Sequence, residues 1–156
     1  NKATVQKFVA GTWTVVGTPG FSAGQASFTS LALDSANTPY VAYMDGANSN
    51  KATVQKFVAG TWTVVGTAGF SAGQARFTSL ALDSANTPYV AYRDSANSNK
   101  ATVMKFDGTS WVNVGSPGFS AGQASYASLA LDSANTPYVA YLDGGNSGKA
   151  TVMKNV

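Results

Sequence analysis

The sequence predicts an all-β fold, a β-propeller with three four-stranded blades in each chain. Three observations predict it: a 49-residue unit that occurs three times, four short strand patterns in each unit, and one long glycine-rich connection between units. The copies are residues 2–50, 51–99 and 100–148, and residues 149–156 repeat the start of the unit. We therefore expect residues 1–156 to form one partial propeller of three repeats plus an extra C-terminal strand.

Four strands are expected in each unit, as residues 29–77 illustrate. The first strand alternates Leu31 and Leu33 with small or polar residues, which is the two-residue period of a strand. The second, PYVAYMD, is apolar on both faces, as in a strand packed between two sheets. A β-solenoid is the alternative, but its repeats are usually shorter. The four strands and the long connection are expected at 29–35, 39–45, 51–57, 62–66 and 67–77.

The first two copies are almost identical, which indicates recent duplication or deliberate construction. They differ at four positions, which are Pro19/Ala68, Ser27/Arg76, Met44/Arg93 and Gly46/Ser95. Engineering, drift and a charged contact at a joint between copies all remain open as explanations of Arg76 and Arg93. The third copy departs further, mainly in its first turn and in the strand that follows.

Residues 30–57, SLALDSANTPYVAYMDGANSNKATVQKF, resemble the NHL-type propeller blade. The shared features are an apolar strand that ends in Asp, a Tyr-Val-Ala strand, and a strand that ends near Lys-Phe. Tyr43 stands where that family usually has Asp, and the acid Asp45 comes two residues later. The resemblance implies that SLALDS is the innermost strand of a blade, which lines the central channel, and that WTVVG is the outermost.

This strand order makes the chain begin in the middle of a blade. Residues 2–8 and 12–17 are then a third and a fourth strand, and 128–154 supply a first, second and third strand. Three blades are too few to close a ring, so we expect a homodimer that forms one six-bladed ring. Residues 2–8 and 149–156 compete for one strand position in that ring. We expect 2–8 to hold it, because Asn155 replaces the phenylalanine of the other copies.

Composition limits the chemistry. The chain contains no Cys and no His, and its seven acidic residues are all Asp. Thiol chemistry, the usual catalytic triads and Cys- or His-based zinc sites are excluded. We therefore predict no catalytic residue, no metal and no cofactor. An active site also needs unlike residues that converge, whereas this sequence repeats like residues, so we predict no enzymatic activity. The net charge of +3 comes from eight Lys and two Arg against seven Asp. The lysines form pairs that recur with the repeat, which favours a solvated strand margin over a nucleic-acid site. No apolar run is long enough for a membrane helix.

Two groups of repeated residues have both a structural and a functional interpretation. Trp13, Trp62 and Trp111 recur at one position of the unit, where packing is favoured over a platform for sugar stacking. Asp-x-x-Asn turns follow each second strand, where hydrogen-bonded turns are favoured over a calcium site because the alternating ligand pattern is missing. These turns and the long connections are expected on one face, at the mouth of the channel. The candidate ligand-binding residues are Phe21, Gln25, Asp45, Asn48, Phe70, Gln74, Asp94, Asn97, Phe119, Gln123, Asp143 and Asn146.

Two classes of function follow from this organisation. The first is a structural or scaffold propeller that assembles by self-association, without a dedicated ligand. The alternative is a multivalent, lectin-like module that binds a carbohydrate or protein through the repeated loops and gains avidity from equal sites. The expected partners are a second copy and a glycan or protein ligand, without nucleic acid or membrane. The composition is compatible with a secreted or cell-surface bacterial protein or a recombinant design.

Overall fold

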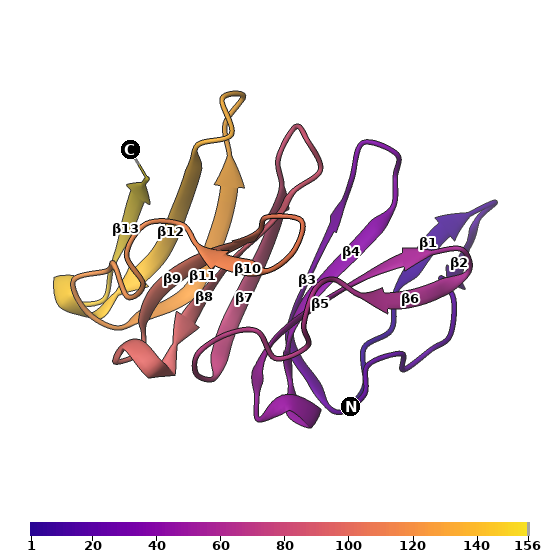
Figure 1. The fold of residues 1–156 in the computed structure, drawn as a ribbon, viewed down its shortest axis with the longest axis horizontal. Coiled ribbons are helices and arrows are strands. Elements are labelled where there is room, and N and C mark those ends of the chain that lie inside the picture. Colours follow the sequence, from indigo (N-terminus) through magenta and orange to yellow (C-terminus); the bar gives the residue numbers. More distant parts are fainter. Residues whose placement is uncertain (156) are drawn as a thin grey trace.

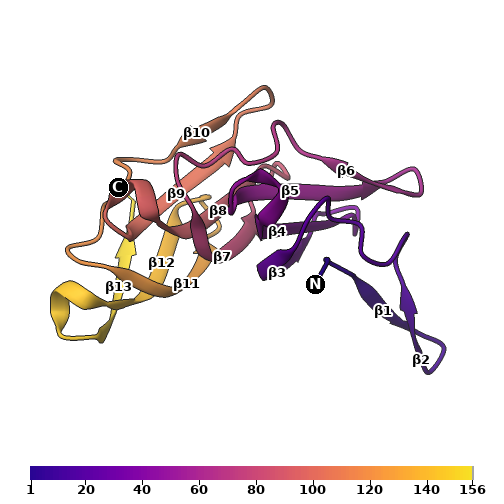
Figure 2. The same cartoon turned by 90° about the horizontal axis from the view of Figure 1, so that it is seen from below.

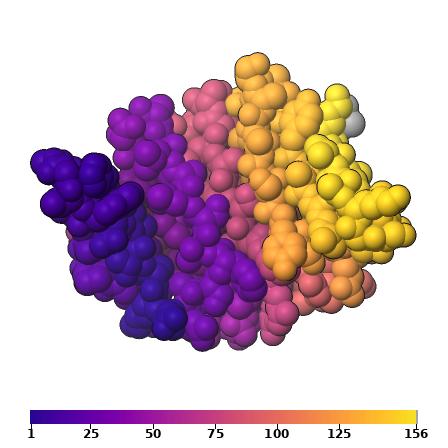
Figure 3. Space-filling model, turned by 180° about the vertical axis from the view of Figure 1, so that it is seen from behind, coloured from indigo at the N-terminus to yellow at the C-terminus, as the bar shows by residue number. Residues whose placement is uncertain are grey.

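The computed structural model describes residues 1–155. Its thirteen strands form four antiparallel sheets that follow one another in chain order (Figure 1). Figure 3 shows the same order from behind, with the N-terminal residues at one end of the molecule and the C-terminal residues at the other. The all-β prediction is confirmed. Within the described residues, no helix is long and apolar enough to span a membrane.

Consecutive strands are neighbours in every sheet, as the blade pattern predicted. The first sheet contains β1 (Gln6–Val9) and β2 (Thr12–Val15). The second contains β3 (Ala26–Leu33), β4 (Pro39–Asp45), β5 (Lys51–Val58) and β6 (Thr61–Val64). The third contains β7 (Ala75–Leu82), β8 (Pro88–Asp94), β9 (Lys100–Phe106) and β10 (Trp111–Asn113). The fourth contains β11 (Ala124–Leu131), β12 (Pro137–Asp143) and β13 (Lys149–Lys154), and short 3₁₀ helices follow β4, β8 and β12 at Gly46–Asn48, Ser95–Asn97 and Gly144–Asn146.

The first strands of the three larger sheets lie beside one another. The backbone N–H of Leu80 on β7 donates to the Ser30 hydroxyl on β3, 3.0 Å away. The same contact joins Leu129 on β11 to Ser79 on β7 at 2.9 Å. Figure 2 shows β3, β7 and β11 in a row along one side of the molecule, with β6 and β10 on the other side. This arrangement agrees with an innermost first strand and an outermost fourth strand.

A bulge near the start of each innermost strand was not predicted. The pairing of β3 with β4 shifts register between Ser27 and Ser30. Phe28 lies in this bulge with φ 53°, a left-handed conformation that is uncommon for a phenylalanine. Phe77 and Tyr126 repeat it, and the ring centroids of successive residues are 4.8 and 4.6 Å apart. A row of aromatic rings therefore runs across the three innermost strands.

The tryptophans join neighbouring sheets. The indole N–H of Trp62 donates to the carbonyl oxygen of Val16 in the preceding sheet, 2.9 Å away. Phe21, in the connection before β3, stacks on Trp62 with 4.1 Å between ring centroids. The packing interpretation therefore describes Trp62, and Trp111 has equivalent contacts. Trp13, at the same position of the first sheet, is 66% exposed.

Both ends of the chain leave a sheet incomplete. The first sheet has two strands and the last has three. In the single chain, β13 pairs with β12 over six residue pairs and holds the third-strand position of the last sheet. That residues 2–8 of a second copy take this position in a ring stays a prediction. Val156, the last residue of the predicted C-terminal strand 149–156, lies outside the described residues.

Candidate functional site

The Asp-x-x-Asn turns, predicted as ligand-binding, are satisfied internally. Asp45 is buried, and its Oδ1 accepts the backbone N–H of Ala47 at 3.0 Å. Its Oδ2 accepts the amide of Asn48 at 2.8 Å and the hydroxyl of Thr53 at 3.0 Å. The carboxylate thus caps the short helix after β4 and fixes β5 beside it. Asp94 and Asp143 are buried and cap the two later turns through the same kinds of bond, and Asn97 repeats the bond of Asn48.

The long connections are held by buried contacts of their own. The Ser71 hydroxyl is buried, accepts the backbone N–H of Ala52 at 2.9 Å and donates to the carbonyl of Gly73 at 2.7 Å. Phe70 stacks on Trp111 with 4.0 Å between ring centroids, as Phe21 does on the tryptophan before it. Phe119 has no such stacking partner among the described residues and makes an edge contact with Tyr141 at 6.3 Å. These phenylalanines are therefore placed by packing.

The glutamines remain exposed at this end of the sheets. Gln25, Gln74 and Gln123 are all exposed, and Asn146 is exposed in the last turn. The guanidinium of Arg93 reaches Gln123 Oε1 at 3.4 Å and the Ser125 hydroxyl at 3.5 Å, both in the next sheet. Of the three explanations for Arg93, a charged contact at a joint between copies is the one with contacts to support it. Among the described residues, no three Asp side chains gather closely enough to hold a metal ion.

A polar pocket forms at the opposite end of the sheets, where no site was predicted. It lies between the sheet β3–β6 and the sheet β7–β10 and has a volume of about 440 Å³. Its wall includes the turn between β7 and β8 and the turn between β9 and β10, away from the short 3₁₀ helices (Figure 1). Its lining residues are Tyr40, Lys56, Val65, Asp83, Asn86, Thr87, Pro88, Tyr89, Lys105, Phe106, Asp107 and Gly108. We call this cavity the inter-sheet pocket.

Two lysines lie over two tyrosine rings in this pocket. The ammonium of Lys56 is 5.9 Å from the ring centroid of Tyr40, and that of Lys105 is 5.8 Å from the ring centroid of Tyr89. At this distance the cation is attracted to the electron-rich face of the ring, which holds the lysine stem against it. Burial, and then the negative charge of Asp34, raises the pKa of Tyr40 above its ordinary value. Tyr40 and Tyr89 are both buried, so the pocket combines a largely covered aromatic wall with the positive charge of the two lysines.

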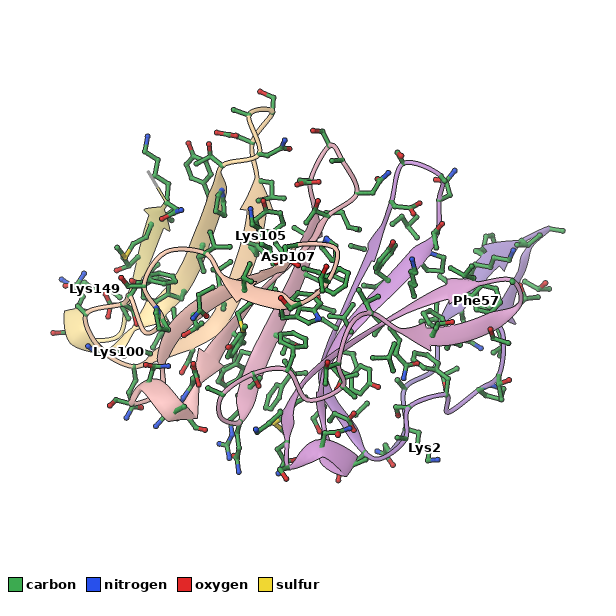
Figure 4. All side chains as sticks on the ribbon, in the orientation of Figure 1. Lys2, Phe57, Lys100, Lys105, Asp107 and Lys149 are labelled. Atoms are coloured by element: carbon green, nitrogen blue, oxygen red, sulfur yellow. The ribbon has the colours of Figure 1, made fainter. Side chains whose placement is uncertain are left out.

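Two carboxylates add negative charge to the same pocket. Asp83 Oδ1 accepts the backbone N–H groups of Ala85 and Thr87 at 2.9 and 2.8 Å. Asp107 follows Lys105 closely in the chain, and Figure 4 labels both beside the turn after β9. The backbone N–H groups of Ser110 and Thr109 hold the pKa of Asp107 below its ordinary value. Both acids are therefore oriented by the backbone of their own turns.

Asp107 also breaks the repeat. The equivalent positions of the first two copies carry Val9 and Val58, so the carboxylate occurs once in the chain. This departure was the sequence signal that could have indicated the pocket. The predicted site residues are those that recur in every unit, and Asp107 does not recur. The pocket instead combines unlike residues from two sheets.

The walls of the inter-sheet pocket are held together across the two sheets. Asn86 Oδ1 accepts the backbone N–H of Ser35 at 2.9 Å, and its amide donates to the Ser35 hydroxyl at 2.8 Å. The pocket lies between two complete four-stranded sheets, so its shape does not depend on the incomplete ends of the chain. It can accommodate a ligand that has both an apolar face and several hydrogen-bonding groups.

No protein-family model matches this chain, and no curated protein matches it. The resemblance to NHL-type blades is therefore not confirmed. Several solved structures are similar to it, among them three with a TM-score of 0.50 or above. A fucose lectin from Kordia zhangzhouensis, solved in complex with methyl-fucoside, is 13% identical over 81% of this chain and 90% of its own, with a TM-score of 0.52.

The other two structures are longer than this chain. An endo-1,4-beta-xylanase from Bacteroides thetaiotaomicron is 12% identical over 88% of this chain and 62% of its own, with a TM-score of 0.54. A protein of unknown function from Dyadobacter fermentans is 12% identical over 90% of this chain and 48% of its own, with a TM-score of 0.50. The chain thus spans less than two thirds of each of these two proteins.

These likenesses show the fold, which is the propeller-type β fold of lectins and glycoside hydrolases, with a blade count consistent with three per chain. They contradict our prediction that the chain is no enzyme, because the fold is one that glycoside hydrolases use. That prediction rested on repeated residues that cannot supply unlike catalytic groups. The inter-sheet pocket brings lysines, tyrosines and aspartates together in spite of the repeat.

Proposed function

We propose that this protein binds saccharides in the inter-sheet pocket. The observation that carries the proposal is the union of Tyr40 and Tyr89 with Lys105 and Asp107 around one cavity. A saccharide ring has an apolar face of C–H groups and an edge of hydroxyl groups. The apolar part of the lining, which includes the half-buried Phe106, fits the first, and charged donors and acceptors fit the second.

The size of the pocket agrees with such a ligand. Ligand pockets usually have volumes of about 300–1,000 Å³ and combine apolar walls with a few oriented polar groups. The inter-sheet pocket measures about 440 Å³. Asp83 accepts backbone N–H groups of its own turn through Oδ1, and Asp107 does the same and also accepts the Ser110 hydroxyl at Oδ2, so the turns fix the orientation of both carboxylates. A monosaccharide or a short oligosaccharide is the ligand class we infer.

The structural neighbours support this choice over a scaffold function. One of them is a lectin that was solved with methyl-fucoside bound, and another is a xylanase. Both are proteins of the same fold class whose ligands are saccharides. A scaffold needs no pocket of unlike polar residues between its sheets.

We also propose that the number of sites grows by association. One chain carries a single pocket with Asp107, so a ring of two chains would present two such pockets. Asp132, Tyr138 and Lys154 occupy the positions of Asp83, Tyr89 and Lys105 in the next unit, where the sheet is incomplete. Two linked sites would bind a multivalent glycan more tightly than either site alone.

A glycan array followed by calorimetric titration tests the binding function. The array includes fucosides and xylo-oligosaccharides, and the titration uses the best monosaccharide or oligosaccharide found. Lys105→Met keeps the stem of the lysine but removes its charge, and Asp107→Asn keeps the acceptor for the turn. We expect each variant to weaken binding about tenfold or more, because a charged hydrogen-bonding group is lost from the site.

Lys7→Met is the matched control, since Lys7 holds the same position of the unit but lies on the exposed first hairpin. It should bind saccharide as the parent chain does. Binding that Lys105→Met and Lys7→Met leave equally intact would place the ligand elsewhere. An array on which no glycan binds would reject the function.

A further inference from the structure

Two tryptophans in the chain occupy the same kind of seat. Trp111 is covered by the stacked ring of Phe70 and donates its indole N–H to the carbonyl oxygen of Val65 at 2.9 Å. Trp62 is placed by Phe21 and Val16 in the same way. In both cases the phenylalanine and the carbonyl come from the segment that precedes the blade, and the tryptophan comes from its fourth strand. We call this arrangement the tryptophan seat.

A third seat stands empty at the C-terminal end. One repeat further along the chain, the equivalent residues are Phe119 and Val114, and within residues 1–155 that sheet has three strands and no fourth strand to supply a tryptophan. A small cavity of about 100 Å³ lies there, lined by Val114, Phe119, Val139 and Met153 among others. Among the described residues, the ring contact of Phe119 is an edge contact with Tyr141, 6.3 Å away, in place of a stacked tryptophan. The seat is therefore built but unfilled.

A third tryptophan lies without a seat at the N-terminal end. Trp13 is on β2, the fourth strand of a blade whose first two strands the chain does not contain. It is 66% exposed, whereas Trp111 is 9% exposed. Its ring contact among the described residues is Phe8 of the same hairpin, with 5.5 Å between centroids. The empty seat and this tryptophan thus lie at opposite ends of the row of sheets.

We propose that Trp13 of one chain inserts into the empty tryptophan seat of a second copy. The β1–β2 hairpin of one copy then supplies the missing fourth strand to the sheet β11–β13 of the other. Trp13 stacks on Phe119 of its host and donates to the carbonyl of Val114, as Trp111 does to Val65. This docking does not depend on saccharide binding.

The sheet faces at the two ends support the same partner. Val152 is 65% exposed on the C-terminal sheet, whereas the equivalent Val54 and Val103, each covered by the next sheet, are 0% and 4% exposed. Leu31 is 53% exposed on the N-terminal side, whereas Leu80, covered by the preceding sheet, is 6% exposed. Within the chain, faces of these two kinds pack against each other twice, between the sheets β3–β6 and β7–β10 and between β7–β10 and β11–β13. The two exposed faces at the ends correspond to the two sides of that contact. A second copy is therefore the partner that matches both.

A polar contact fixes the alignment of this joint. Inside the chain, Asn86 binds Ser35, and Asn135 binds Ser84 through the same pair of hydrogen bonds. The repeat leaves one such asparagine and one such serine unused, Asn37 and Ser133. Docking of two copies would bring Asn37 of one chain to Ser133 of the other, near the innermost strands.

Native mass spectrometry and sedimentation of the parent chain and of Trp13→Ala test the insertion. Trp13 is exposed, so its removal leaves the folded chain intact and should act on association. We expect the parent to be a dimer at micromolar concentration and Trp13→Ala to raise the dissociation constant at least about 30-fold, as for a buried tryptophan at an interface. Phe119→Ala should act likewise from the other side of the joint. Thr109→Ala, in an exposed turn away from both ends, is the control and should dimerise as the parent does.

Cysteine pairing tests the alignment, since the chain has no cysteine of its own. A mixture of Asn37→Cys and Ser133→Cys chains should form a disulfide-linked dimer under oxidation, and Trp13→Ala in both chains should suppress it. The double variant Ser35→Cys and Asn86→Cys is the geometric control, because those side chains already meet within one chain. A monomeric parent chain, an unchanged dissociation constant in Trp13→Ala, or no link between the mixed chains while the control pair closes would each overturn the proposal.

Discussion

The indole N–H of Trp111 donates to the carbonyl oxygen of Val65, 2.9 Å away, and so ties the sheet β7–β10 to the sheet before it. Replacement of Trp111 by Phe keeps a ring in the seat but leaves that carbonyl without its donor. We expect a loss of about 1–3 kcal/mol in the free energy of unfolding, the usual cost of an unsatisfied buried polar group. Urea denaturation measures it. Thr63→Ala, an exposed change on β6, should cost little, and equal stability of the two variants would disprove this role of the indole.

Leu80 and Leu31 occupy the same position of the repeat but have different surroundings. Leu80 is buried between two sheets, and Leu31 is exposed at the open N-terminal face. Leu80→Ala should therefore destabilise the fold by about 2–5 kcal/mol. Leu31→Ala should leave the chain as stable but weaken its association. Thermal melting and sedimentation separate the two effects, and similar destabilisation by both changes would contradict the assigned packing.

The sequence pattern alone would have chosen Leu82 for this test. Leu82 packs against the core but is only half-buried. The alternation of Leu with small residues correctly placed both leucines on one strand. It could not tell which of them the neighbouring sheet covers more completely.

Acid should weaken the fold through the aspartates that cap turns. Backbone N–H groups of Ser110 and Thr109 lower the pKa of Asp107, and the N–H of Thr136 does the same for Asp132. A pKa lowered in the folded state stabilises the fold above the unfolded value of about 3.9 and loses that contribution as the pH falls through the folded value. We expect Asp107→Asn to show a smaller fall in melting temperature between pH 7 and pH 3 than the parent. The same fall in both would refute this source of acid sensitivity.

Deletion of residues 149–156 tests which strand holds the third position in the blade that the two copies form together. In the single chain β13 holds the position beside β12, but Asn155 stands where Phe106 packs on Trp111 one repeat earlier. If residues 2–8 of the second copy replace it in the dimer, deletion of 149–156 should leave the melting temperature of the dimer almost unchanged. A large loss of stability would show that the C-terminal strand closes the joint.

The strands could be predicted from the sequence because each is encoded locally. Leucine alternation, the Tyr-Val-Ala run and the Asp-Ser-Ala-Asn turns placed the repeating strands within a few residues of their observed bounds. The bulge at Phe28 could not be predicted, because its left-handed φ arises at a phenylalanine rather than a glycine. The ring of Phe28 contacts Phe77 on the neighbouring innermost strand, and a local sequence pattern carries no information on such a contact between sheets.

The inter-sheet pocket lies at the opposite end of the sheets from the residues that the sequence predicted as a site, for a related reason. Asp45 and Asn48 recur in every unit and looked like ligands, but they satisfy each other. The inter-sheet pocket instead unites Tyr40 with Lys105 and Asp107, which are far apart in the sequence and meet only when two sheets pack. The repeat highlights residues that recur in every unit, whereas this pocket depends on Asp107, which does not recur.

An NMR titration of the isotope-labelled protein with the best saccharide from the array locates the binding site. We expect the amide signals of Lys105, Asp107 and Thr87, around the inter-sheet pocket, to shift most. Signals of the turn at Asp94 and of the connection at Gln74 should stay in place. Shifts that concentrate at Asp94 and Gln74 would contradict binding in the inter-sheet pocket and would place the saccharide at the repeated loops.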